Sequence, residues 1–155
     1  MTAALSGSEV AAKITERFPG SVVESKDSSI LVTGKSLLDV AGFLKTAPGL
    51  ELNYLVGVTA VDYLKYFEVV YHFNSLNLNQ SLTLKVRVEG RTSPTVPSLT
   101  PLWRGADLQE REVYDLMGIK FAGHPNLKRI VLWDGFNGHP QRKDWKAEAK
   151  NTNVN

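Results

Sequence analysis

The chain has 155 residues, 43% of them hydrophobic, with 18 basic and 16 acidic side chains and no cysteine. This length predicts one globular domain with a buried core, and the near-neutral charge argues against a dedicated nucleic-acid binder, which must neutralise many phosphates. The lack of cysteine excludes disulfides, thiolate zinc sites, cysteine nucleophiles and cysteine-ligated iron–sulfur clusters. Because no apolar run spans a bilayer and no signal-peptide pattern is present, we expect a soluble, cytoplasmic chain.

The N-terminal third predicts two helices and a short pair of strands. Ser6 followed by Glu9 forms a capping-box pattern at the start of the first helix. A Pro-Gly pair follows each helix, and proline cannot continue a helix. In chain order we expect a helix at residues 7–18, strands at 22–24 and 30–33, and a second helix at 36–46.

Three longer strands are expected at residues 52–59, 67–74 and 82–88. In the last of them, leucine and valine alternate with threonine, lysine and arginine, which indicates a sheet with one covered face. The two helices must cover that face. The sequence therefore predicts an α+β fold, a two-layer domain in which helices cover a mixed or antiparallel sheet.

A third helix is predicted from Pro101 to Met117, with Thr100 as its N-cap and Gly118 as its C-terminal cap. Past this helix, prolines, charges and single aromatic residues interrupt every regular pattern. We therefore expect an α+β core domain at residues 1–123.

Residues 124–155 are expected to form an extended, irregular C-terminal docking arm and tail. Trp133, Phe136 and Trp145 lie in this arm, which offers no regular element to bury them. Each large apolar side chain gains roughly 1.5–3 kcal/mol on full burial, so we expect these three to meet a partner surface.

Glu110 is the unusual residue of the third helix, because it falls within the apolar stripe of that helix. One interpretation is a catalytic acid with a raised pKa. We favour a structural ion pair with a basic residue from positions 128–142, since an unpaired buried carboxylate is costly. On the flank of the helix, Asp107, Arg111 and Asp115 are spaced four residues apart and are expected to pair along it.

The chain has three histidines, at positions 72, 124 and 139. His72 lies within a strand pattern and is expected at the edge of the core. His124 and His139 each precede a proline, and a metal site with Asp134 or Asp144 is one interpretation. No spacing holds two imidazoles on one element, so we favour rings that donate to backbone carbonyls and fix turns.

Residues 110–131, EREVYDLMGIKFAGHPNLKRIV, closely resemble the signature of the 30-kDa subunit family of respiratory complex I, whose members are the C subunits of NADH–quinone oxidoreductase. The flanking YLVGVTAVDY at residues 54–63 and the downstream GHP and RKD triplets extend the resemblance over residues 52–145. Gln141 stands where the family usually has leucine. By this resemblance, the signature and interface residues are Glu110, Arg111, Glu112, Asp115, His124, Pro125, Lys128, Arg129, His139, Arg142, Lys143 and Asp144.

The resemblance implies a non-redox structural subunit of the peripheral arm of a proton-translocating NADH:quinone oxidoreductase. Such a protein carries no cofactor or metal of its own, because NADH, FMN, the iron–sulfur clusters and quinone belong to partner subunits. It braces the D subunit, which contains the quinone site, and the cluster-bearing B and G subunits in a hetero-oligomer. It lies on the cytoplasmic side of the cell membrane and meets the membrane only through the complex.

Three other functions are considered. The nearest alternative is the equivalent subunit of an energy-converting hydrogenase, or of a ferredoxin-accepting relative of complex I, since this chain does not reveal the electron donor. A free-standing α+β module that binds RNA would use stacked aromatic residues such as Tyr71 and Phe73 on a sheet face. A hydrolase built on Glu110 and a histidine lacks a recognisable nucleophile.

Overall fold

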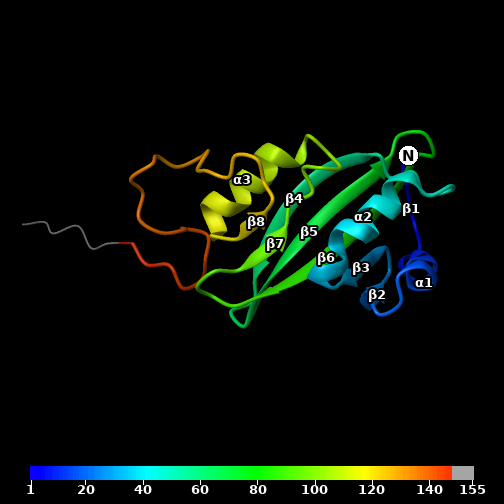
Figure 1. Cartoon of the computed structure of the whole chain (residues 1–155), viewed down its shortest axis with the longest axis horizontal. Helices are drawn as coiled ribbons and strands as arrows, with labels where there is room; N and C mark the ends of the chain where they lie inside the picture. The colour runs from blue at the N-terminus through cyan, green and yellow to red at the C-terminus, as the bar shows by residue number, and fades with distance from the viewer. Residues whose placement is uncertain (148–155) are drawn as a thin grey trace, which may run out of the picture.

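The computed structural model describes residues 1–147, which form an α+β fold of helices packed on a sheet (Figure 1). In chain order the elements are β1 (Ala3–Ala4), α1 (Gly7–Arg17), β2 (Val22–Lys26), β3 (Ser29–Val32), the 3₁₀ turn η1 (Gly34–Ser36), α2 (Leu37–Thr46), β4 (Tyr54–Asp62), β5 (Tyr66–Ser75), β6 (Gln80–Glu89), β7 (Thr95–Pro97), α3 (Ala106–Met117) and β8 (Lys120–Ala122). No helix in this range is long and apolar enough to cross a membrane.

The main sheet is mixed and has the strand order β2-β3-β6-β5-β4, with β1 added beside β6. Strand β6 pairs in parallel with β1 and β3 and antiparallel with β5, and β4 pairs antiparallel with β5. A small second sheet joins β7 and β8 in parallel. The predicted fold class is therefore confirmed, including the mixed sheet.

One face of the main sheet carries the hydrophobic core. Phe67, Tyr71 and Phe73 of β5 are buried on this face, in one cluster with residues of all three helices. Tyr71 and Phe73 therefore cannot stack on nucleic-acid bases, which removes the basis of the RNA-binding alternative. His72 points to the opposite face and is exposed, with its Nδ1 3.2 Å from Thr83 Oγ1, so its expected position at the core edge is wrong.

The first two helices form as predicted, and Ser6 caps α1 by accepting a hydrogen bond from the Glu9 backbone N–H. The third helix begins later than predicted, at Ala106, and Thr100 is not its cap. The Thr100 backbone N–H donates to the Ser98 hydroxyl, and the chain makes tight turns before the helix starts. Local side-chain bonding thus outcompetes the helix start that the sequence suggested.

Candidate functional site

The signature residues gather at the end of the molecule formed by α3, opposite the end where α1 lies (Figure 1). Residues 124–147, called the C-terminal segment below, contain no helix or strand and contact α3 from Asp107, near its start, to Leu116, near its end. Buried ionic groups hold this irregular segment in place at two positions, one at Asp115 and one at Asp62.

The carboxylate of Asp115 is the first of these positions, and it is fully buried. Its Oδ2 accepts three successive backbone N–H groups, from Ile130 (3.1 Å), Val131 (2.8 Å) and Leu132 (2.8 Å). Its Oδ1 accepts from the Arg129 guanidinium at 2.6 Å. Burial alone would raise the pKa of Asp115, but these hydrogen bonds outweigh burial and the pKa is lowered, so the side chain is a carboxylate.

Arg129 connects Asp115 to the following turn of the segment. Its Nη1 donates to the Asp115 carboxylate and carbonyl, and its Nη2 donates to the carbonyls of Phe136 and Gly138 at 3.0 and 2.8 Å. Its guanidinium carbon also lies 5.8 Å from the centre of the Phe136 ring. The planar guanidinium suits this role, because its fixed donors can reach several acceptors at once.

Three more signature side chains bond to backbone around α3. Arg111 donates to the carbonyls of Lys128 and Arg129. His124 accepts from the Asn126 N–H at Nδ1, so its Nε2 carries the proton and donates to the carbonyl of Asp107 at 3.0 Å. His139 Nδ1 lies 2.8 Å from the carbonyl of Asp115, to which it must donate. The prediction that both histidines donate to backbone carbonyls is confirmed.

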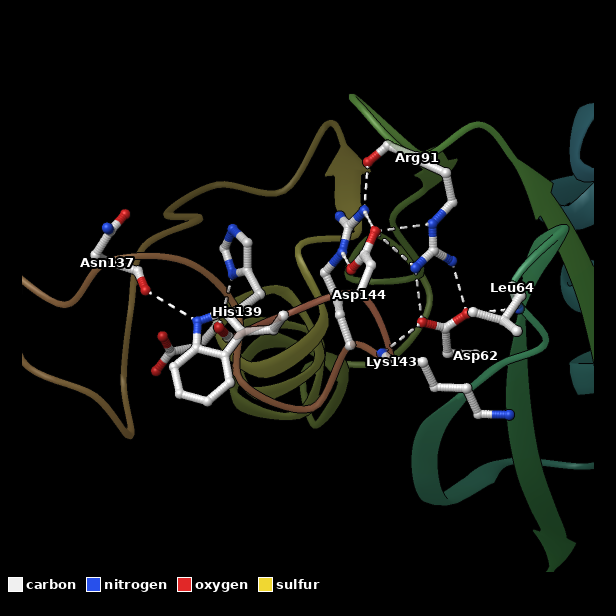
Figure 2. Close-up of polar contacts among 10 residues, drawn as sticks. Asp62, Leu64, Arg91, Asn137, His139, Lys143 and Asp144 are labelled. Carbon is white, nitrogen blue, oxygen red and sulfur yellow. Dashed lines mark hydrogen bonds and ion pairs between the residues drawn. The ribbon is translucent and has the colours of Figure 1, made fainter. Parts of the chain in front are cut away.

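The second anchoring position is Asp62, at the end of β4 (Figure 2). Arg91, just after β6, donates to both Asp62 oxygens at 2.6 and 2.9 Å and also to Asp144. The backbone N–H groups of Leu64 and Lys143 complete the Asp62 site. The hydrogen bonds from Arg91 are the largest of the effects that hold the pKa of Asp62 well below its usual range.

Arg142 joins the same network. It donates to the carbonyl of Arg91 at 2.6 Å and to both oxygens of Asp144. The guanidinium carbons of Arg91 and Arg142 lie 4.5 and 5.1 Å from the centre of the Phe67 ring, within the range of cation–π attraction. The end of the C-terminal segment is thereby fastened to the edge of the main sheet.

Glu110 is fully buried, as predicted, but its expected basic partner is wrong. The Ser98 hydroxyl donates to Oε2 at 2.6 Å, and the Leu99 backbone N–H donates to Oε1 at 2.7 Å. No ion pair to Glu110 occurs within residues 1–147. Burial raises its pKa, and the two hydrogen bonds offset only part of that effect. Glu110 therefore fixes the turn before α3.

The expected pairing along the helix among Asp107, Arg111 and Asp115 is also wrong. Asp107 Oδ1 lies 3.2 Å from His124 Nε2, and Asp115 pairs with Arg129 rather than with Arg111. Each of these side chains reaches the C-terminal segment instead, because the segment lies directly over this flank of α3. The contact with Arg129 leaves Asp115 fully buried, whereas the side chain of Asp107 stays 41% exposed beside His124.

At residues 130–133 the segment turns backbone N–H groups inward and apolar side chains outward. The exposed fractions of Ile130, Val131 and Trp133 are 41%, 59% and 69%. Phe136 and Trp145 are half-buried and stack on each other with ring centres 5.9 Å apart, and Trp133 packs edge-on against Phe136 at 5.0 Å. Exposed apolar side chains gathered on one short segment indicate an interaction site.

The remaining predicted site residues, Glu112, Pro125, Lys128 and Lys143, are exposed at their side chains. The prediction missed Asp62 and Arg91 as site residues, although Asp62 lies within the YLVGVTAVDY segment that extends the family resemblance. Strand order held a further signal: β4 and β6 both run antiparallel to β5, so their C-terminal ends lie at the same end of the sheet. Among residues 1–147, no group of three or more histidine, aspartate or glutamate side chains is placed to hold a metal ion.

Comparison with known proteins identifies the family. Residues 30–151 match the family described as respiratory-chain NADH dehydrogenase, 30 Kd subunit. The C subunit of NADH-quinone oxidoreductase from Roseiflexus sp. strain RS-1 is 41% identical, over 91% of this chain and 84% of that protein. The protein of the same name from Moorella thermoacetica is 44% identical, over 79% of this chain and 82% of that protein.

A solved structure shares the fold. A chain in the structure of a membrane-bound sulfane sulfur reductase, an archaeal respiratory membrane complex, superposes with a TM-score of 0.72 and 23% identity. The match covers 90% of this chain and 85% of that one. The signature at residues 110–131, the family match and the identities to its named relatives agree, and the chain belongs to the 30 kDa subunit family of the respiratory-chain NADH dehydrogenase.

Proposed function

We propose that this chain is a structural, non-redox subunit of the peripheral arm of a proton-translocating NADH:quinone oxidoreductase, respiratory complex I. One observation carries the proposal beyond family membership. The C-terminal segment bonds its polar groups to α3 and the sheet, and leaves Ile130, Val131 and Trp133 exposed. A segment built in this way gains by docking on another protein, and catalysis within the chain has no role in that arrangement.

In this proposal the segment docks on the D subunit, which contains the quinone site, and the chain also braces the cluster-bearing B and G subunits. NADH, FMN, iron–sulfur clusters and quinone belong to these and other partner subunits. The lack of cysteine supports this division, because cluster-bearing subunits hold their iron through cysteine thiolates. The chain would lie on the cytoplasmic side of the cell membrane and meet the membrane only through the complex.

The same architecture would serve in an energy-converting hydrogenase or in a ferredoxin-accepting relative of complex I. The relatives at about 40% identity are all named as C subunits of NADH-quinone oxidoreductase, which favours the NADH-linked enzyme. The companions of the tagged chain, purified at native abundance, distinguish these functions. Co-purification of a flavin-bearing NADH-oxidising subunit is expected, and a hydrogenase subunit in its place would refute the NADH-linked assignment.

Truncation after Leu132 tests the docking role directly. It removes Trp133, Phe136 and Trp145 but retains the three amides that bond to Asp115. We expect a chain that keeps its circular dichroism spectrum and no longer enters the complex. A folded, truncated chain that co-purifies with the quinone-site subunit at the yield of the full chain would contradict the proposal.

A further inference from the structure

Residues 130–133 are an unusual surface loop because they reverse the normal arrangement of polar and apolar groups. A typical surface loop turns its polar groups to water. Here the backbone N–H groups of residues 130–132 all point inward to one buried carboxylate, on Asp115. Three apolar side chains, Ile130, Val131 and Trp133, point outward and together form what we call the apolar knob.

The support beneath the knob is built from side chains of the isolated chain. Asp115 lies on α3, a regular helix, and Arg129 links its carboxylate to the carbonyls of Phe136 and Gly138 on the far side of the loop. His139 then bonds to the Asp115 carbonyl, and the Gln141 N–H bonds to the carbonyl of Leu116. The loop is thus fixed on both sides of the knob before any partner is present.

From this geometry we infer that the apolar knob is a preformed docking element, positioned by Asp115 and Arg129, that enters an apolar socket on the partner subunit. The inference rests on the proposed function and names the chemistry of the docking site. A preformed element loses little conformational entropy on binding, whereas a flexible arm must be ordered at that moment. An exposed tryptophan within a rigid loop also fits the residue preference of binding hot spots.

The unpaired charge of the C-terminal segment is mostly basic. Arg129 and Arg142 have carboxylate partners within the chain. Lys128, Lys143 and Lys146 are exposed and form no ion pair among the described residues, whereas Asp134 is the exposed acid of residues 124–147 that is likewise unpaired. The excess of lysine along the segment favours a partner surface that carries carboxylates, which would set register and association rate more than affinity.

Amide hydrogen exchange on the free, full-length chain tests preformation. We expect the N–H groups of residues 130–132 to exchange roughly 100-fold more slowly than in an unstructured peptide, because opening must first break their bonds to Asp115. Asp115→Asn should remove that protection. Asp134→Asn is the matched control, since it makes the same chemical change on an exposed side chain nearby and should leave the exchange rates unchanged.

Incorporation into the complex is measured in parallel, by quantitative mass spectrometry of the purified complex from cells that carry each full-length variant. Trp133→Ala should leave the exchange rates of residues 130–132 unchanged and reduce incorporation by roughly tenfold or more. Asp115→Asn should reduce both protection and incorporation. If this variant does not fold, Arg129→Lys replaces it, because lysine keeps the charge but cannot bridge the four oxygens that Arg129 reaches.

The outcomes separate the inference from the proposed function. Fast exchange at residues 130–132 in the wild-type chain would overturn preformation, as would a folded Asp115→Asn chain that loses protection yet incorporates normally. In either case, failure of the Trp133→Ala chain to incorporate would still support docking. Normal incorporation of both Trp133→Ala and the chain truncated after Leu132 would overturn the proposed function itself.

Discussion

Helix α3 carries two fully buried acids, Glu110 and Asp115, and the structure predicts losses of stability of very different size when each is neutralised. In Asp115→Asn, the Arg129 guanidinium loses its carboxylate and three backbone N–H groups lose an anionic acceptor. Removing one member of a buried ion pair costs about 3–5 kcal/mol of unfolding free energy. We expect a loss of that size from Asp115→Asn.

Glu110→Gln is the matched change, and we expect it to cost about 1 kcal/mol or less. No cation pairs with Glu110 in the described chain, so no partner charge is left alone. The glutamine oxygen can still accept from the Leu99 N–H, and the new amide can donate to the Ser98 hydroxyl. The change keeps a hydrogen bond at each of these two positions, and exchanging one hydrogen bond for another has a small net effect on stability.

Urea unfolding at neutral pH, followed by circular dichroism, measures both variants against the wild type. Equal slopes of unfolding free energy against urea would show that the two-state comparison holds. The Asp115→Asn chain should also melt roughly 10 °C lower than the wild type. A loss under about 1 kcal/mol for Asp115→Asn, or a larger loss for Glu110→Gln than for Asp115→Asn, would refute the reasoning.

The pH dependence of folding stability is a second test of the Glu110 site. Its folded-state pKa is raised above the ordinary value of 4.5, so the folded state binds this proton more tightly than the unfolded chain does. Stability from this group is present below about pH 4.5 and is lost as pH rises through the folded pKa. The Glu110→Gln chain should lack that decline, and an identical pH profile for the two chains would contradict a raised pKa.

Three further outcomes are expected. Gly118→Ala should destabilise the chain by more than Gly123→Ala. Both residues have positive φ, but only at Gly118 would the added Cβ meet the His139 ring, at 2.7 Å, so equal losses of stability in urea would contradict this packing. Hydrogen bonds from Arg142 and Arg91 lower the pKa of Asp144 to about 2, so the end of the C-terminal segment should loosen as pH falls from 3.8 to about 2. Tryptophan fluorescence should change over that range in the wild type, and Asp144→Asn should flatten the change. Elemental analysis of the purified chain should find no stoichiometric zinc or iron, and either metal at a stoichiometric level would contradict the expectation that the chain binds none.

The sequence predicted most of the secondary structure because those patterns are local. Alternation in residues 82–88 identified both a strand and its covered face, and the Ser6 cap placed the start of the first helix at Gly7, where it is observed. The third helix was predicted too long, because the Ser98 hydroxyl and the Glu110 carboxylate organise the preceding turn. The contact between Ser98 and Glu110 joins residues that are far apart in the sequence, so no local pattern indicates it.

The partners of the charged residues, in contrast, were decided by tertiary structure alone. The sequence identified residues that do make such contacts, since Arg129 pairs with Asp115, Arg111 donates to the Arg129 carbonyl and His124 donates to the Asp107 carbonyl. It expected the wrong partners, however: a basic residue for Glu110, and Arg111 rather than Arg129 for Asp115.

The physical reason is that helix periodicity fixes which residues share a face, whereas the path of an irregular segment over that face depends on the whole fold. The signature determined by itself the family of the chain. Only the fold showed that Asp62 and Arg91, at the ends of two strands that β5 separates, fasten the segment, and that the segment turns Trp133 outward.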